Sequence, residues 1–350
     1  MCAALTIALD GMGGDHAPEI VVEGAAIALN RHPHVRFLVF GDQVRLLPLL
    51  ARHAKLREHS EIVHTDEVVA PDEKAGQALR RGRNSSMRLA IDAVHEGRAA
   101  GVVSAGNTGA LMAIAKFVLR TLPGIDRPAI VSFVPTLNGE AVMLDLGANV
   151  ECDASNLVQF AVMGANFAHS VLGRMRPTVG LLNVGSEHMK GNETLRHAAD
   201  MLRAAPALAF DFVGFVEGDD IGKGTVDVVV TDGFTGNVAL KTMEGTARLM
   251  AGTLASVMRL SWATKLAYLI ARPALGALRD RMDPRQYNGG VFLGLNGICV
   301  KSHGGTDATG FANAIGVAID MASDRLTERI ASDFAEFQAG FTSDLKAALS

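Results

Sequence analysis

Short apolar runs alternate with longer helical patterns through most of this 350-residue sequence. The runs are apolar at consecutive positions, which is typical of strands buried on both faces. Such strands, when separated by helices, predict a parallel sheet covered by helices on both sides. The predicted strands are Leu5–Leu9, Arg36–Phe40, Glu61–Thr65, Ala100–Ser104, Ala129–Phe133, Ala141–Asp145, Thr178–Asn183, Asp211–Val216, Val226–Thr231 and Ile298–Lys301. The fold class is therefore α/β, with one sheet or two linked sheets.

Helical periodicity fills the segments between these runs, and several segments open with Thr, Asp or Asn, which cap helix N-termini. The predicted helices are Pro18–Arg31, Ser86–Gly97, Thr108–Leu119, Asp153–Leu172, Asn192–Ala204 and Gly236–Leu260. There is no internal repeat and no low-complexity linker, so we treat residues 1–350 as a single large α/β unit. A helical hairpin at residues 248–283 lies within it.

Composition excludes several classes of protein. The 33 Lys and Arg against 37 Asp and Glu give 33 − 37 = −4, and a slightly acidic chain is a poor nucleic-acid binder. The N-terminus lacks the basic segment of a signal peptide, and no apolar stretch is long enough to span a bilayer. Cys2, Cys152 and Cys299 are distant and odd in number, which favours reduced thiols in the cytosol over a disulfide framework.

Five predicted strands are followed by turns that combine Gly with Asp, Asn, Ser or Thr. These turns cover residues 10–15, 104–109, 145–149, 183–187 and 231–237. The carboxyl ends of strands in open α/β sheets form the crevice where ligands bind. Any one turn is explained by ordinary turn and capping chemistry, but five together predict a large polar site along a single edge of the sheet.

The second of these turns has the features of a phosphate site. Free backbone N–H groups at a helix N-terminus, flanked by small residues, bind anions. The candidate phosphate-binding residues are Ser104, Gly106, Asn107 and Thr108, with Gly13 from the first turn and Arg83 beside a helix start at residues 85–86. Lys190, just before another predicted helix, could pair with the same anion or could be an ordinary surface lysine.

Other cofactor and catalytic motifs fail on spacing. Gly218–Thr225 has one residue too few between its glycines for a P-loop, and Gly11–Gly14 lacks the third glycine of a dinucleotide fingerprint. There is no Gly-x-Ser-x-Gly elbow, and the histidines lack metal-ligand spacing. The sequence predicts anion chemistry without nucleotide, metal or covalent serine.

Two basic segments complete the pattern. Arg80, Arg81, Arg83 and Arg88 fall within nine residues, which suits an acidic partner or simply a solvated face. Between Arg248 and Arg279 there is no Asp or Glu, while apolar side chains recur three or four residues apart. These are Leu254, Val257, Met258, Trp262, Leu266, Tyr268, Leu269 and Ile270. They predict a basic amphipathic helix pair, broken at Pro273, that lies on an anionic membrane surface or in a dimer interface.

The motifs taken together are those of a known family. They are Asp10–Asp15, Ser104–Met112, Asp145–Asn149, Asn183–Gly191, Asp232–Asn237, Lys241–Gly245, Gln286–Gly289 and Lys301–Gly304, in this order. From about Leu5 to about Ile330 the chain resembles the bacterial phosphate acyltransferase family, PlsX.

This resemblance implies transfer of a fatty acyl group from acyl carrier protein to inorganic phosphate, within fatty acid and phospholipid (phosphatidic acid) biosynthesis. It implies a three-layer α/β/α fold related to phosphotransacetylases and isocitrate-dehydrogenase-like proteins, a homodimer, and no cofactor. It further implies a cytoplasmic enzyme, peripherally bound to the membrane, that passes acyl phosphate to a membrane glycerol-3-phosphate acyltransferase.

Roles for the remaining candidates follow from the reaction. Phosphate is largely a dianion near neutral pH, so it has to be positioned rather than deprotonated. We expect Lys190 to help hold it, Asn183 and Asn237 to stabilise the tetrahedral oxyanion, and His303 to serve the leaving thiol. Asp145 and Asp232 are expected to orient these donors, and Arg80, Arg81 and Arg88 to dock the carrier protein.

Two alternatives remain open on sequence alone. One is a short-chain phosphotransacetylase that uses coenzyme A, and the other is a non-enzymatic module that binds acyl chains or a carrier protein. The sequence does not give the preferred acyl length.

Overall fold

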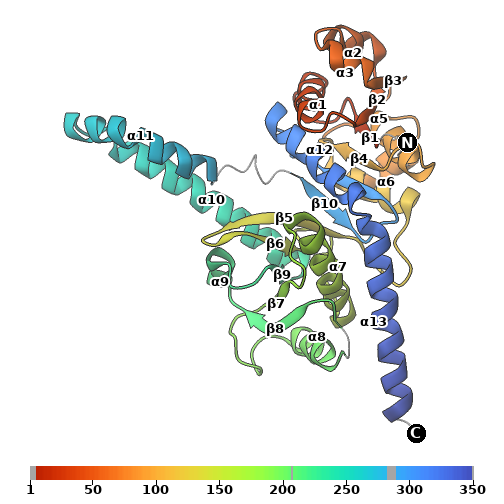
Figure 1. Ribbon diagram of the computed structural model, residues 1–350, viewed down its shortest axis with the longest axis vertical. Coiled ribbons are helices and arrows are strands. Elements are labelled where there is room, and N and C mark those ends of the chain that lie inside the picture. The colour runs from red at the N-terminus through yellow and green to blue at the C-terminus, as the bar shows by residue number, and fades with distance from the viewer. Residues whose placement is uncertain (1–4, 206–207, 282–288, 349–350) are drawn as a thin grey trace.

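The computed structural model describes residues 5–205, 208–281 and 289–348 (Figure 1). Cys2, residues 286–288 of one motif and the last two residues of the predicted hairpin lie outside these ranges. Within the described residues, eleven strands form one sheet in the order β3-β2-β1-β4-β11-β10-β5-β6-β9-β7-β8. The strands are β1 (Thr6–Asp10), β2 (Arg36–Gly41), β3 (Ser60–His64), β4 (Gly101–Ser104), β5 (Ala129–Thr136), β6 (Gly139–Leu144), β7 (Thr178–Leu182), β8 (Asp211–Val216), β9 (Val228–Val230), β10 (Gly290–Leu293) and β11 (Ile298–Lys301).

Helices connect these strands and cover them. They are α1 (Glu19–Arg31), α2 (Gln43–Leu50), α3 (Ala54–Glu58), α4 (Ala75–Arg81), α5 (Ser86–His95), α6 (Thr108–Leu119), α7 (Ala154–Leu172), α8 (Glu193–Ala204), α9 (Gly218–Lys223), α10 (Gly233–Val257), α11 (Trp262–Arg281), α12 (Ala308–Ser323) and α13 (Leu326–Ala348). No described helix has both the length and the apolar character needed to cross a membrane.

The sheet has two faces, each covered by helices. Side chains alternate between the faces along a strand. Ile7 and Leu9 of β1 therefore belong to the core beneath α1, α7 and α12, whereas Ala8 between them belongs to the core beneath α5 and α6. Leu240 of α10 packs on the core that covers the second half of the sheet, with Met143 of β6. The predicted three-layer α/β/α architecture is confirmed.

The direction of the strands changes in the middle of the sheet. Strands β3, β2, β1, β4 and β11 are parallel to one another, and so are β6, β9, β7 and β8. Three successive antiparallel pairings, β11 with β10, β10 with β5 and β5 with β6, separate these two blocks. An odd number of reversals makes the second block run opposite to the first, so their carboxyl ends lie at opposite edges of the sheet.

The prediction that all five Gly-rich turns point to one edge is therefore wrong. Every predicted strand is present, but β10 was not among the predictions, since its three apolar residues, 291–293, lie between glycines at 289, 290 and 294, which are typical of turns. The β5–β6 hairpin was also not recognised, although Asn138-Gly139 is a hairpin signal. Gly139 has φ +124°, a conformation that favours glycine.

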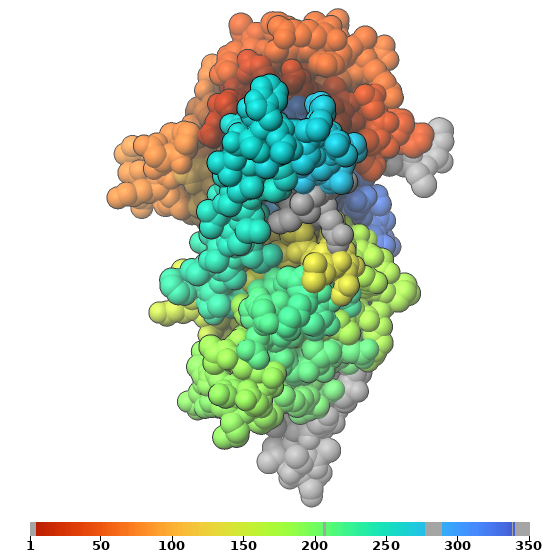
Figure 2. All heavy atoms as spheres, turned by 90° about the vertical axis from the view of Figure 1, so that its left-hand side faces the viewer, coloured from red at the N-terminus to blue at the C-terminus, as the bar shows by residue number. Residues whose placement is uncertain are grey.

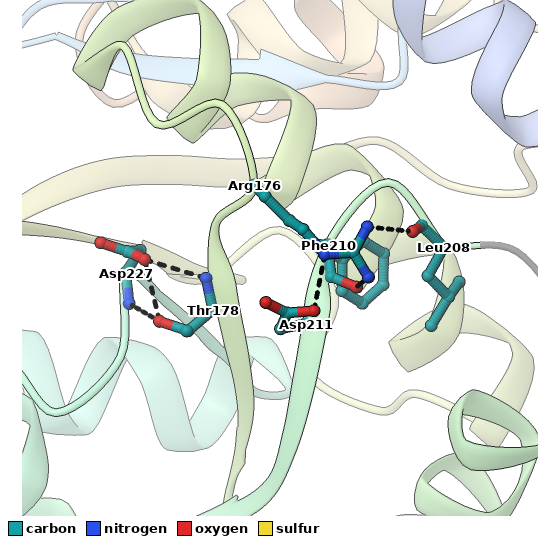
Figure 3. Close-up of polar contacts among 6 residues, drawn as sticks. All are labelled: Arg176, Thr178, Leu208, Phe210, Asp211 and Asp227. Atoms are coloured by element: carbon teal, nitrogen blue, oxygen red, sulfur yellow. Dashed lines mark hydrogen bonds and ion pairs between the residues drawn. The ribbon is translucent and has the colours of Figure 1, made fainter.

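Polar contacts fix the amino ends of the second block (Figure 3). The backbone N–H and hydroxyl of Thr178 at the start of β7 both donate to Asp227 Oδ2, at 2.9 and 2.8 Å, and the Asp227 N–H donates to Thr178 Oγ1 at 2.9 Å. Arg176 donates to Asp211 Oδ1 at 2.7 Å and to the Leu208 carbonyl at 3.2 Å. These bonds hold β7, β8 and β9 in register.

Helices α10 and α11 form an arm that projects from the body of the molecule (Figures 1 and 2). The chain reverses between Val257 and Trp262. There Ser261 caps α11, because its Oγ accepts a hydrogen bond from the Thr264 N–H at 3.1 Å. The predicted break at Pro273 is wrong, because α11 continues through it. Proline leaves one carbonyl of the preceding turn unpaired, and on an exposed helix water can satisfy that carbonyl.

Candidate functional site

A buried carboxylate organises the carboxyl edge of the first block. Asp10 ends β1, is 1% exposed, and accepts hydrogen bonds from the hydroxyls of Ser86 and Ser104, each at 2.6 Å. The Met12 N–H also points to this carboxylate, at 3.4 Å. Burial raises the pKa of Asp10, and the bonds from Ser104 and Ser86 oppose the shift. Asp10 thus ties β1 to the end of β4 and to the start of α5.

Three Gly-rich loops meet around this carboxylate. We call residues 10–15, 104–109 and 301–306 the first-edge group. A Cβ at Gly13 would lie 2.8 Å from the Gly106 N atom and 2.3 Å from Asp10 Oδ2, so the first two loops approach too closely for a side chain there. The Asp15 N–H donates to the Gly304 carbonyl at 3.0 Å, which brings in the third loop. The structure therefore brings Gly13, Ser104 and Gly106 together as predicted.

Two of these loops lead into capped helices. Asn107 Oδ1 accepts from the Ala110 N–H at 3.0 Å and so caps α6, while its Nδ2 donates to the carbonyls of Pro71 and Glu73, each at 2.9 Å. Asp307 caps α12 by accepting from the Gly310 N–H at 2.9 Å. Because the side chain of Asn107 is committed to these bonds, the loop offers an anion its backbone N–H groups and the hydroxyl of Thr108 rather than the Asn107 amide.

Lys301 lies at the centre of the first-edge group, and the sequence reasoning missed it. Its ammonium donates to the Ala105 carbonyl at 3.4 Å and to the Ser302 carbonyl. Burial lowers the pKa of Lys301 to about 8, partly offset by the charges of Asp10 and Asp15. Its position at the end of a predicted strand, within a motif of the family, was a signal that could have identified it.

His303 follows Lys301 and faces α10. Burial lowers the pKa of His303, and the positive charges of Lys301 and Lys241 lower it further. Lys241 forms an ion pair with Glu244 at 3.0 Å on the same turn of α10. Helix α10 starts at the carboxyl edge of the second block, so its middle turns carry charged side chains from that edge to the His303 loop.

A second set of loops occupies the opposite edge. We call residues 145–149, 183–191 and 231–237 the second-edge group. Asp145 is fully buried and accepts from the N–H groups of Ile130, Gly147, Ala148 and Asn149, at distances from 2.7 to 3.2 Å, and from Asn149 Nδ2 at 2.9 Å. Burial raises the pKa of Asp145 against these bonds. Its carboxylate is saturated by donors that shape the loop.

Other predicted residues of the second-edge group also have structural partners. Asn183 Oδ1 accepts from the Val184 N–H at 2.8 Å and Asn183 Nδ2 donates to the Lys190 carbonyl at 3.2 Å, which closes the loop. Asp232 caps α10 by accepting from the Thr235 N–H at 2.8 Å. Lys190 is exposed in this group, at the edge opposite to the Ser104 loop, so the structure does not place the two at one edge.

Asn237 is the predicted residue that stands where α10 meets the Asp145 turn. A Cβ on Gly147 would lie 3.7 Å from the Asn237 side chain. Gly236 beside it packs directly on the Asp145 carbonyl, where a Cβ would be 2.0 Å away. The first turn of α10 therefore packs on the loops of the second-edge group.

The arginine cluster divides into paired and exposed members. Arg88 forms an ion pair with Asp92 at 2.8 Å and lies over the ring of Phe117. Arg80, Arg81 and Arg83 are exposed on α4 and the loop after it. Two of the three predicted docking residues therefore present free surface charge.

The arm of α10 and α11 exposes large apolar side chains. Trp262 is 86% exposed and Ile270 75% exposed, and Lys265 lies 5.3 Å from the Trp262 ring. Others exposed on the arm are Leu249, Met250, Leu254, Val257, Leu260, Leu266, Tyr268 and Leu269. Met258 at the turn is half-buried.

The described residues contain one group of three metal-ligand side chains, Asp42, His64 and Asp66. His64 Nδ1 accepts from the Gln43 N–H at 3.2 Å, so in the neutral ring the proton is on Nε2, which points to Asp66 at 3.5 Å. Neither nitrogen of that ring then offers a lone pair to a metal ion. Asp42 also caps α2.

Comparisons with known proteins agree with this fold and these motifs. Residues 5–329 match a family model described as fatty acid synthesis protein. The phosphate acyltransferase of Rhodospirillum centenum is 63% identical over 339 residues, which cover 97% of this chain and 95% of that protein. The phosphate acyltransferase of Rhodospirillum rubrum is 56% identical over 338 residues, which cover 97% of each chain.

Solved structures resemble the chain in fold. A phosphotransacetylase from Streptococcus pyogenes superposes with a TM-score of 0.62 at 19% identity, and the EutD phosphotransacetylase from Staphylococcus aureus with a TM-score of 0.60 at 18% identity. Each comparison covers 91% of this chain and 94% of the other. The predicted relation to the phosphotransacetylase fold is confirmed.

Proposed function

Because the chain belongs to the phosphate acyltransferase family, we propose that it takes its acyl group from acyl carrier protein and binds inorganic phosphate at the first-edge group. The chain is an acyltransferase of fatty acid and phospholipid synthesis, and its product is acyl phosphate.

The observation that carries the proposal is the meeting of three Gly-rich loops around Lys301. Gly13 is buried and Gly106 is half-buried, and a Cβ at either would overlap neighbouring atoms, so the two glycines allow the loops to pack closely together. Helix α6 begins at Thr108, directly after the second loop, so its free N–H groups and its dipole favour an anion there. Small loops, a helix N-terminus and a cation together suit a compact dianion such as phosphate.

The reaction requires positioning more than proton removal. A phosphate oxygen attacks the thioester carbonyl carbon, the C–O bond forms, and the carbonyl oxygen becomes an oxyanion. The C–S bond then breaks and the electron pair leaves with sulfur. Holding the two reactants in register can supply several kcal/mol of the barrier reduction. Donors aimed at the oxyanion supply more.

We assign His303 to assist the leaving thiol. A pantetheine thiol has a pKa of about 8.5, so it can depart as thiolate near neutral pH. The lowered pKa of His303 keeps its ring neutral there, and a neutral ring can donate a hydrogen bond to the departing sulfur. Protonation of the thiolate can then come from solvent.

The second-edge group positions α10 and offers two exposed donors. Asp232 caps this helix and Asp145 shapes the turn on which Gly236 rests, so both act as positioning residues. Asn183 holds the loop that carries Lys190. Asn237 and Lys190 lie at the edge opposite to the proposed phosphate site, so we assign them no contact with the reacting thioester carbonyl.

Thiol release from acyl carrier protein and from coenzyme A thioesters, with and without inorganic phosphate, tests this function. We expect phosphate-dependent release from the carrier-protein thioester, and Gly13→Ala should abolish it because the new Cβ would overlap Asp10 and Gly106. Gly76→Ala is the matched control, since nothing lies within 4 Å of its Cβ. Preference for coenzyme A would indicate a phosphotransacetylase, and no release from either donor would leave a binding module.

Carrier-protein docking is proposed for the exposed arginines. Carrier proteins are acidic, and Arg80 and Arg81 are exposed on α4, which packs against α6. Reversing both charges to Glu should raise the KM for the carrier-protein donor and leave the KM for phosphate unchanged. An unaltered donor KM would leave these residues as a solvated face. Arg88 is excluded from this pair because its ion pair with Asp92 gives it a structural role.

Peripheral membrane binding and homodimer formation are proposed for the arm. Its exposed apolar side chains and its lack of acidic residues after Arg248 up to Arg279 suit an anionic membrane surface, where the acyl phosphate would pass to a glycerol-3-phosphate acyltransferase. Replacing Trp262, Leu266 and Ile270 with Asp should release the protein from anionic vesicles. If vesicle binding persists while the protein becomes monomeric, the arm is a dimer interface alone.

A further inference from the structure

Lys301 is a lysine at a place where burial makes its charge costly. It ends β11 between the loop after β4 and the loop that leads to α12. An ammonium group has three donors, and the hydrogen bonds that Lys301 makes go to the carbonyls of Ala105 and Ser302. Hydrogen bonds to neutral carbonyls offset little of the desolvation free energy of a buried charge, and an anion offsets much more of it.

The charges that face Lys301 come from several elements. Asp10 on β1 and Asp15 in the loop after it attract the ammonium, whereas burial raises the pKa of the Cys299 thiol on the same strand and keeps that thiol neutral. His303, which follows it, is the other titratable group within range. Among the described residues no carboxylate forms an ion pair with Lys301, and both oxygens of Asp10 already accept bonds from serine hydroxyls. One ammonium donor is thus available toward the loops.

We infer that Lys301 is the cationic group that binds the attacking phosphate. It does so through the third N–H of its ammonium group, which its bonds to the Ala105 and Ser302 carbonyls do not use. The inference rests on the proposed function and deepens it, since it moves the phosphate-binding charge from Lys190, at the opposite edge, to the centre of the first-edge group. The Ser104 hydroxyl donates to Asp10 and the Gly106 N–H donates to Ser104 Oγ, so the further donors for phosphate are the exposed N–H groups of Thr108 and Gly109 at the start of α6. A bound dianion would in turn favour the charged form of Lys301.

Two consequences distinguish this role from neutralisation of Asp10 and Asp15. Loss of the ammonium should weaken phosphate binding and leave the acyl donor unaffected. Phosphate binding should also weaken as pH rises through about 8, where Lys301 loses its proton. The second pKa of inorganic phosphate is about 7, so the fraction of dianion increases between pH 7 and 8 and is nearly complete above pH 8. Phosphate ionisation therefore cannot cause a decline in binding above about pH 8.

The experiment is steady-state kinetics of phosphate-dependent thiol release, with inorganic phosphate as the varied substrate, from pH 7 to 9.5. Lys301→Met should raise the KM for phosphate about ten- to a hundredfold, the range expected for losing one hydrogen bond to a charged group, with an unchanged KM for the acyl donor. Lys55→Met, an exposed lysine on α3, is the matched control and should behave as wild type.

Lys301→Arg keeps the test decisive if the Met variant fails to fold. Arginine stays charged throughout this range, so the decline of kcat/KM for phosphate above pH 8 seen in the wild type should disappear in Lys301→Arg. A wild-type profile that is flat to pH 9.5, or a normal phosphate KM in a folded Lys301→Met, overturns the inference. Absence of phosphate-dependent release in the wild type would instead overturn the proposed function.

Discussion

Substitutions at two glycines in α10 test whether the start of this helix packs on the Asp145 turn. Gly236 and Gly245 are both helical, and alanine in place of glycine in a helix interior gains about 1 kcal/mol from backbone propensity. A Cβ at Gly245 meets nothing within 4 Å. A Cβ at Gly236 would lie 2.0 Å from the Asp145 carbonyl oxygen and 2.8 Å from Thr231 Cγ2. The same substitution therefore has opposite consequences two turns apart.

The magnitudes follow from those contacts. Gly245→Ala should stabilise the protein by about 0.5 to 1 kcal/mol, the propensity gain alone. In Gly236→Ala the carbonyl belongs to the backbone of the Asp145 turn and cannot rotate away, so the helix or the turn has to shift. Overpacking of this kind costs about 1 to 3 kcal/mol or more and outweighs the gain. Because the propensity gain is common to both variants, they should differ by the overpacking cost, roughly 1 to 3 kcal/mol or more in the free energy of unfolding.

Urea unfolding followed by far-ultraviolet circular dichroism measures this difference. We expect the midpoint of Gly245→Ala to lie at or above that of the wild type and the midpoint of Gly236→Ala to lie clearly below it. Equal midpoints for the two variants would refute the reasoning, because α10 would then not rest on the Asp145 turn.

Three further perturbations have defined outcomes. Ser104→Ala removes a 2.6 Å bond to buried Asp10 and should lower the free energy of unfolding by about 1.5 to 3 kcal/mol in a urea titration, while unchanged stability would mean that Asp10 is protonated and indifferent to this donor. Asp232→Ala removes the α10 cap from the Thr235 N–H and should cost about 1 kcal/mol, with Asp232→Asn restoring most of the loss. Lys301 has a folded pKa of about 8 against 10.5 for a free lysine, so the unfolded chain binds more protons between these values and stability rises with pH across that window, by at most about 3 kcal/mol. Thermal unfolding of the wild type and of Lys301→Met between pH 8 and 10.5 should show this rise in the wild type alone, and parallel profiles would contradict it.

Much of the fold was predictable because the buried strands are apolar on both faces. The runs that became β1, β2, β4 and β7 begin and end within one residue of their predicted bounds. Strand β10 was not predicted because glycines enclose its apolar residues 291–293, and its two antiparallel pairings begin the reversal of the sheet. A local pattern does not encode the direction of a partner strand, so the division of the turns between two edges could not be predicted.

Individual residues of the candidate site were more predictable from the sequence than their positions relative to one another. Ser104, Gly106 and Gly13 were named from loop chemistry, and the structure places them together. Lys301 was passed over because a lysine at a strand end looks ordinary until its burial is known. Asn107 and Asn183 were expected to contact substrate, yet their amides are bound to backbone groups, which requires knowledge of segments distant in sequence.

The central claim is that orthophosphate bound at the first-edge group intercepts an acyl thioester. Thiol release from an acyl carrier protein thioester, measured together with acyl phosphate trapped by hydroxylamine, tests it most directly. The account predicts that both products appear in equal amounts, that both require phosphate, and that both fall together in Gly13→Ala. Thiol release at the same rate without phosphate, or release without trapped acyl phosphate, would contradict it.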